Sequence, residues 1–161
     1  MEDRKHIRQH IELNDEYCNY LRAIICPSIP IPSSLTYSMM VNDFIGIFPY
    51  IKVVEIYDIY VDPRLRNKGI GSSFIQEICR LNQDSVILLA SGATSMEYPE
   101  EPSDEEIKKI IEDLEPFYLK NGFVNVNDKI GNYQMKRAYM YSGNTLGKYC
   151  ISKLLEDNPE L

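Results

Sequence analysis

Hydrophobic and polar positions divide the centre of the chain into segments with two different periods. Over residues 70–81 apolar side chains recur every three or four positions, which predicts a helix with one buried face. Residues 103–120 repeat this period, and Ser103 followed by Glu106 is the capping-box pattern of a helix start. Between them SVILLAS, residues 85–91, is short and apolar throughout, as in a strand buried on both faces.

The first sixty residues are predicted to form a helical start, a loop and three strands. Apolar residues within 3–25 follow helical spacing and predict one or two helices. Three prolines in CPSIPIPSS, residues 26–34, predict a loop. The runs YSMMV, FIGIFPYI and KVVEIYDIYV are rich in β-branched and aromatic residues, so we expect them to form an antiparallel meander.

The last forty residues are predicted to form two strands and a helix. GFVNVND and YQMKRAYMY have strand character, and TLGKYCISKLL has a helical apolar face. No repeat or linker interrupts the order of elements, and 161 residues suit one hydrophobic core. The sequence therefore predicts one α/β domain over residues 1–161, with the final helix at about residues 144–156.

Composition and charge exclude several function classes. The net charge is −7 without a basic block, which disfavours binding to nucleic acid and to anionic membranes. No apolar run approaches the roughly 20 residues that span a bilayer. The N-terminal MEDRKHIRQH is too polar for a secretory signal, so we expect a cytoplasmic protein.

The cysteines and histidines do not form a metal-binding pattern. The four cysteines are scattered without a CxxC pair, which favours reduced and partly buried thiols. His6 and His10 are four residues apart, but two solvated side chains explain this spacing better than half a metal site does. We therefore expect no metal.

The glycine-rich stretch RLRNKGIGSSF, residues 64–74, lies between a predicted strand and a predicted helix. Free amide groups at a helix start attract anions, and glycine lets a phosphate approach the main chain. Arg66 and Lys68 add positive charge. A Walker loop is excluded because no GK pair follows, and a dinucleotide fingerprint is excluded because Phe74 replaces its third glycine.

Two segments in order along the chain resemble the GNAT superfamily of acyl-CoA-dependent N-acetyltransferases. Arg66-x-x-Gly69-x-Gly71 directly after EIYDIYVDP resembles the family's pyrophosphate signature. FYLKNGF, residues 117–123, resembles its later helix-to-strand segment, and YQMK is similar to its final strand. The resemblance covers about residues 36–141. It implies an α/β (α+β) fold in which a mixed central sheet has helices on both faces, here with an extra C-terminal helix.

The resemblance implies acetyl-CoA as co-substrate and assigns residues that hold it. Main-chain amides would bind the pyrophosphate, and they belong to Asn67, Lys68, Gly69, Ile70, Gly71 and Ser72. The end of the preceding strand would pair with the pantetheine arm through Ile59, Tyr60 and Val61. In this family that strand splays from the next parallel strand, here SVILLAS, and the arm fills the gap.

The chemistry needs a base for the attacking ammonium and an acid for the leaving thiolate. Tyr118 matches the family's general-acid tyrosine four residues before Gly122. Glu55 matches the base glutamate of the histone-modifying members, and Asp58 is its rival. Simple alternation places Glu55 on one face with Tyr57, Ile59 and Val61, and Asp58 on the other unless a bulge intervenes.

The acceptor side departs from the family's pattern. Many members have an asparagine seven residues before the tyrosine, where this chain has Ile111. The acidic stretch 97–106 is a candidate to attract a cationic amine, although a solvated loop with a helix start that favours acids explains it better. The implied function is acetyl transfer from acetyl-CoA to a small-molecule or peptide amine by direct attack. The alternative is a weak or inactive module that binds acyl-CoA or a protein partner. Both a monomer and a homodimer are compatible with the final helix.

Overall fold

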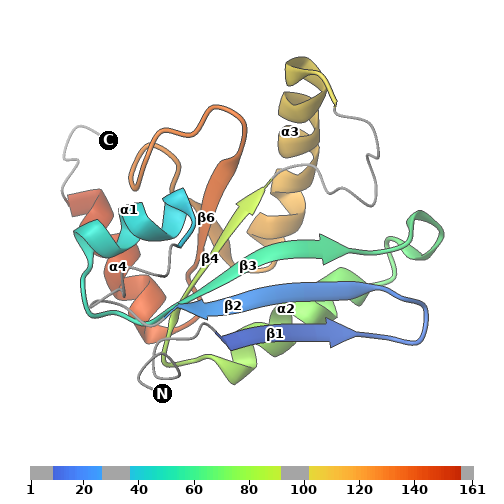
Figure 1. Cartoon of the computed structure of the whole chain (residues 1–161), viewed down its shortest axis with the longest axis horizontal. Coiled ribbons are helices and arrows are strands. Elements are labelled where there is room, and N and C mark those ends of the chain that lie inside the picture. Colours follow the sequence, from blue (N-terminus) through green and yellow to red (C-terminus); the bar gives the residue numbers. More distant parts are fainter. Residues whose placement is uncertain (1–8, 27–36, 92–101, 157–161) are drawn as a thin grey trace.

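The computed structural model describes residues 9–26, 37–91 and 102–156. Six strands and four α-helices lie in this part of the chain (Figure 1). The strands are β1 (Gln9–Asn14), β2 (Tyr20–Cys26), β3 (Val53–Tyr60), β4 (Val86–Ser91), β5 (Phe123–Asn125) and β6 (Arg137–Tyr141). The helices are α1 (Met39–Ile47), α2 (Ile70–Leu81), α3 (Asp104–Lys120) and α4 (Thr145–Glu156), with a 3₁₀ turn at Pro63–Leu65.

The strands form one mixed sheet in the order β1-β2-β3-β4-β6-β5. All neighbouring pairs are antiparallel except β3 and β4, which are parallel at the centre of the sheet. The connection from β3 to β4 runs through α2, as a parallel pair requires a crossover. The central parallel pair therefore has the glycine-rich turn at the end of its first strand.

Helices cover both faces of this sheet, as the resemblance implies. On one face α1 and α4 bury side chains such as Phe44 and Cys150 against Val86 and Met140. On the other face α2 and α3 bury Ile75 and Tyr118 among others. In Figure 1 α1 and α4 lie at the end of the sheet opposite α3. The predicted fold class is confirmed.

The helical periods of the central and last segments are confirmed. α2 begins at Ile70 and ends at Leu81, and β4 is buried over most of its length. α3 begins after Ser103, whose side chain accepts from the Glu106 amide while the Glu106 side chain accepts from the Ser103 amide. α4 occupies the predicted C-terminal segment. Capping and periodicity are local signals, so tertiary contacts had little to override here.

The predicted N-terminal helices are wrong, because described residues 9–26 form the β1–β2 hairpin. Asp15 closes the turn by accepting from the amides of Tyr17 and Asn19, at 2.9 and 3.0 Å. Such a side-chain turn competes with helix formation. Ile11 and Leu13 alternate with polar neighbours toward the α2 face, a period of two that the helical template masked.

The two strands predicted at YSMMV and FIGIFPYI are also wrong, since α1 covers three of the five residues of the first and four of the eight residues of the second. Ser38 caps this helix by accepting from the Val41 amide at 3.2 Å. The buried residues Met40, Val41, Phe44 and Ile45 have helical spacing. The β-branched and aromatic residues of this segment favoured strands. It forms a helix because its apolar face is buried against the sheet.

KVVEIYDIYV does form a strand, β3, whereas β5 and β6 are shorter than the predicted strands. The predicted loop at 26–34 lies almost wholly outside the described residues. Within the described ranges, no helix combines the length and apolarity needed to cross a membrane.

Candidate active site

The parallel strands β3 and β4 separate at the centre of the sheet. Their pairing runs from Val53–Val86 to Ile56–Leu89 and stops there, although both strands continue. Main-chain groups of β3 beyond Ile56 therefore lack a partner in β4. Such a gap can receive an extended ligand through main-chain hydrogen bonds.

A bulge at Tyr57 accompanies this separation. Opposite β2, Ala23 pairs with Ile56 and Arg22 pairs with Asp58, so Tyr57 is the extra residue. The bulge resets the alternation and turns Asp58 to the same face as Glu55. The expectation that Glu55 shares a face with Ile59 is therefore wrong, and the alternative with a bulge is correct.

The glycine-rich turn joins β3 to α2 through two residues in the left-handed region. Asn67 has a φ of 64° and Gly69 a φ of 82°. Gly69 is the N-cap of α2 and has no side chain that could accept a hydrogen bond from the first amides of the helix. A Cβ on Gly69 would meet nothing within 4 Å, which shows an open approach to the main chain.

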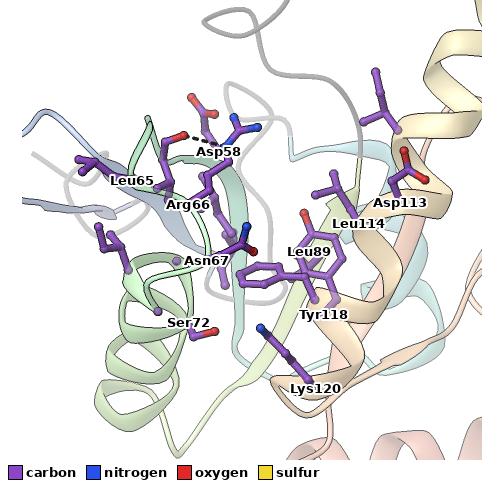
Figure 2. A pocket seen from close by; sticks show the side chains of 18 of the residues that line it. Asp58, Leu65, Arg66, Asn67, Ser72, Leu89, Asp113, Leu114, Tyr118 and Lys120 are labelled. Atoms are coloured by element: carbon purple, nitrogen blue, oxygen red, sulfur yellow. Dashed lines mark hydrogen bonds between the residues drawn. The ribbon is translucent and has the colours of Figure 1, made fainter. Parts of the chain in front are cut away.

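A pocket of about 640 Å³ opens between the separated strands, this turn and α3 (Figure 2). Ten predicted site residues line it, namely Asp58, Ile59, Val61, Arg66, Asn67, Gly69, Ile70, Gly71, Ser72 and Tyr118. The volume lies within the ordinary range of small-molecule sites, about 300–1,000 Å³. The pocket thus brings the strand end, the glycine-rich turn and the tyrosine together, although they lie far apart in sequence.

Three predicted site residues, Glu55, Tyr60 and Lys68, do not line the pocket. Glu55 is 8% exposed, and its Oε2 accepts from Ser38 Oγ at 2.8 Å. Because Ser38 is the N-cap of α1, Glu55 connects β3 to the start of that helix. Tyr60 pairs with Tyr20 of β2, against which its ring stacks at 5.8 Å.

Sequence reasoning missed the wall that α3 contributes. Ile110, Asp113, Leu114, Phe117 and Lys120 line the pocket from this helix. Each of them lies three or four residues from another member of this set, and Leu114 lies four from Tyr118, which was the signal for a shared face. In Figure 2 Lys120 points across the pocket toward the start of α2. A cation there favours an anionic ligand.

Phe117 joins α3 to the glycine-rich turn. A Cβ on Gly71 would lie 3.0 Å from the Phe117 ring, so glycine allows this close approach. Asn121 Nδ2 donates to Ser72 Oγ at 3.1 Å from the end of the same helix. These contacts hold Tyr118 of α3 at a fixed distance from the N-terminus of α2.

Tyr118 lies on α3 against β4 and is only 7% exposed. Its ring contacts those of Phe117 and Tyr139 at centroid distances of 5.4 and 5.2 Å. Burial raises the pKa of Tyr118 to about 12, and the Ser91 hydroxyl opposes that rise. The phenol is therefore protonated at neutral pH and can donate a proton.

Asp58 places a carboxylate at the pocket, held by a cation from the neighbouring strand. Arg22 Nη1 lies 3.4 Å from Asp58 Oδ2, and Arg22 Nε lies 3.1 Å from Glu12 Oε1. The Arg22 guanidinium also lies 4.2 Å from the centre of the Tyr20 ring. This polar cluster occupies the sheet face of Glu55, opposite α2.

Among the residues that the structure describes, no cysteine lines the pocket. Burial raises the pKa of Cys79 to about 12 and that of Cys150 to about 11, so both thiols stay protonated. Among the residues described, no three His, Cys, Asp or Glu side chains gather in a way that could hold a metal ion.

Only some of the residues that could contact the acceptor amine lie in the part of the chain that the structure describes. Glu97, Glu100 and Glu101 lie outside the described residues, whereas Asp104, Glu105 and Glu106 form the first turn of α3. The helix dipole also favours carboxylates in this N-terminal turn. Ile111, at the place of the family's asparagine, is buried within α3 and offers no polar group.

Comparisons with known proteins give a family and a distant structural neighbour. A search of the solved structures found an acetoin utilization protein from Exiguobacterium sibiricum 255-15, with 13% identity and a TM-score of 0.46. That likeness covers 91% of this chain and 67% of the other. No curated protein matches the chain significantly. The acetyltransferase (GNAT) domain matches residues 38–125, more than half of the chain, and this protein therefore belongs to the GNAT family.

Proposed function

We propose that this protein transfers an acetyl group from acetyl-CoA to a primary amine by direct attack. The observation that carries the proposal is the gap between β3 and β4, which opens beside the start of α2. CoA has an extended pantetheine arm, which suits the gap, and an anionic pyrophosphate, which suits the helix start. Membership of the GNAT family supports the same reading.

The chain's own residues fit such a ligand. The edge of β3 that faces away from β2, around Ile59, can bind amide groups of the pantetheine arm, as an added strand would. The first amides of α2, reached past Gly69, can bind the pyrophosphate, with positive charge from Arg66 and Lys120. When bound, acetyl-CoA supplies a thioester that an uncharged amine can attack.

The acid and the base of the reaction are proposed to be Tyr118 and Asp58. Asp58 lines the pocket and can take a proton from the acceptor nitrogen, whereas Glu55 is held by Ser38. As the carbon–sulfur bond breaks, the electron pair goes to sulfur and Tyr118 Oη gives its proton there. The absence of a pocket thiol among the described residues favours direct attack over a covalent enzyme intermediate.

Ligand binding tests the proposal first. CoA at about 100 times its Kd adds about 2.7 kcal/mol to the stability of the folded chain. For a domain of this size that raises the Tm by roughly 5–10 °C, measured by differential scanning fluorimetry. Pantetheine, which lacks the pyrophosphate, is the control and should raise the Tm far less. A Tm that CoA does not change would contradict the proposed site.

Turnover then separates the enzyme from the alternative binding module. Release of free CoA is measured with acetyl-CoA and a panel of neutral and cationic primary amines. We expect release with at least one amine. Stabilisation by CoA without release on any amine would instead favour a module that binds acyl-CoA.

A second test distinguishes the two candidate bases. We expect Asp58→Asn to lower kcat roughly 100-fold, since general-base catalysis contributes about 10²–10⁴-fold. Glu55→Gln should mainly lower the Tm, because it weakens the bond to the α1 cap. Both kcat values are measured with one amine, beside the Tm of each variant. A larger loss of kcat in Glu55→Gln at unchanged Tm would reverse the assignment.

A further inference from the structure

Ser91, the last residue of β4, carries a buried hydroxyl that the proposed chemistry has not used. The residue is fully buried, and its Oγ lies outside good hydrogen-bonding geometry to every partner in the described part of the chain. It is the one buried side-chain nitrogen or oxygen in this state among the described residues. Buried polar groups without partners are rare in native proteins and often mark functional sites.

The hydroxyl is placed beside Tyr118. Alternation along β4 puts Ser91 on the same face as Leu89, which packs against α2 and α3 and lines the pocket. Tyr118 covers this face from α3. The Ser91 side chain is near enough to the Tyr118 hydroxyl for a weak hydrogen bond, which lowers the pKa of Tyr118 against the rise from burial.

We propose that Ser91 is a positioning residue for Tyr118: its Oγ–H donates to Tyr118 Oη and turns the phenolic proton toward the pocket. This inference rests on the proposed acetyl transfer. A hydroxyl that donates to Oη leaves the Tyr118 proton free to point at the leaving sulfur. Chained hydroxyl groups also polarise one another, which strengthens each bond.

The same bond stabilises the state that follows proton transfer. Tyr118 becomes a phenolate when its proton moves to the thiolate sulfur, and it regains a proton from water after the products leave. Ser91 keeps its own proton and donates to the phenolate, where a charge-assisted bond is roughly twice as strong as a neutral one. Proton transfer from Tyr118 needs this stabilisation of the phenolate. A phenol with a pKa of about 12 is a weak acid toward an ordinary thiolate, whose thiol has a pKa of about 8.5.

A double-mutant cycle tests whether Ser91 acts through Tyr118. We expect Ser91→Ala to lower kcat roughly tenfold with the KM for acetyl-CoA unchanged, since one charge-assisted bond is lost. In a chain that already carries Tyr118→Phe, the same change should have no further effect. Independent, multiplying losses of kcat would overturn the proposal.

Stability and a matched control separate this role from packing. Ser91→Ala removes one hydrogen bond to Tyr118, so the Tm should fall by no more than roughly 2–4 °C. Ser85, the residue just before β4, is equally buried, but its Oγ donates to Asp84 Oδ1 at 3.3 Å, so Ser85→Ala should keep the kcat. A fall of kcat that merely follows a fall of Tm would contradict a positioning role.

A spectroscopic readout does not depend on turnover. The ¹³Cζ resonance of Tyr118 is assigned by its loss in Tyr118→Phe, and is then compared in wild type, Ser91→Ala and Ser85→Ala. We expect it to shift in Ser91→Ala alone. If the resonance shifts but no amine is acetylated, the bond exists and the proposed function fails. If amines are acetylated and the resonance does not shift, the Ser91 proposal fails by itself.

Discussion

Replacement of Tyr118 by phenylalanine is expected to lower the kcat of acetyl transfer roughly 100- to 1,000-fold while CoA still binds. General acids contribute about 10²–10⁴-fold to such reactions, and phenylalanine keeps the ring but has no proton to give. The ring contacts with Phe117 and Tyr139 should persist. Steady-state release of CoA gives the kcat, and the thermal shift with CoA shows that the pocket is intact.

Tyr133→Phe is the matched control for Tyr118→Phe. Tyr133 is also a nearly buried tyrosine, but its hydroxyl donates to Asp43 Oδ2 at 2.7 Å and lies outside the pocket. This variant should lose stability and keep its kcat. If Tyr118→Phe retained full activity, Tyr118 would not be the acid, whatever the role of the pocket.

Gly147→Ala is expected to destabilise the protein by about 3 kcal/mol or more, because the backbone has no room for a side chain there. Gly147 lies in the first turn of α4, and a Cβ on it would overlap the main-chain oxygen of Tyr141 in β6. A backbone atom cannot rotate away as a flexible side chain can. For a domain of this size the Tm should fall by roughly 6–12 °C.

Gly46→Ala provides the opposite expectation from the same chemical change. Gly46 lies in α1, and a Cβ on it would meet nothing within 4 Å. Alanine is a better helix former than glycine by about 1 kcal/mol, so this variant should be slightly more stable. Urea unfolding of the two variants beside wild type measures the difference. Equal stabilities for the two variants would refute the close packing of α4 on β6.

A segment's own residues predicted its structure correctly where its capping and apolar periodicity matched the face that the fold buries. The capping box at Ser103 and the apolar face of α2 are complete within a few residues, so no distant contact was needed to read them. The N-terminal hairpin and α1 show the contrary case. Their residues suit either a helix or a strand, and the choice depends on which face the sheet buries.

The candidate site divides in the same way. The glycine-rich turn and the Tyr118 segment were recognisable as short motifs, and both line the pocket. The wall made by α3 was readable in principle from its helical spacing. The sequence did not predict which of Glu55 and Asp58 reaches the pocket. The extra residue at Tyr57 reverses the sheet face on which each later residue of β3 lies.

By itself, then, the sequence determined the family, the central strand–helix–strand unit and half of the residues that line the pocket, because their signals are complete within short stretches of the chain. The tertiary structure decided where β3 and β4 separate, which carboxylate reaches the pocket, and that Ser91 lies buried beside Tyr118. Each of these is a relation between segments more than 25 residues apart in the chain. Only packing, and not local preference, brings such segments into contact.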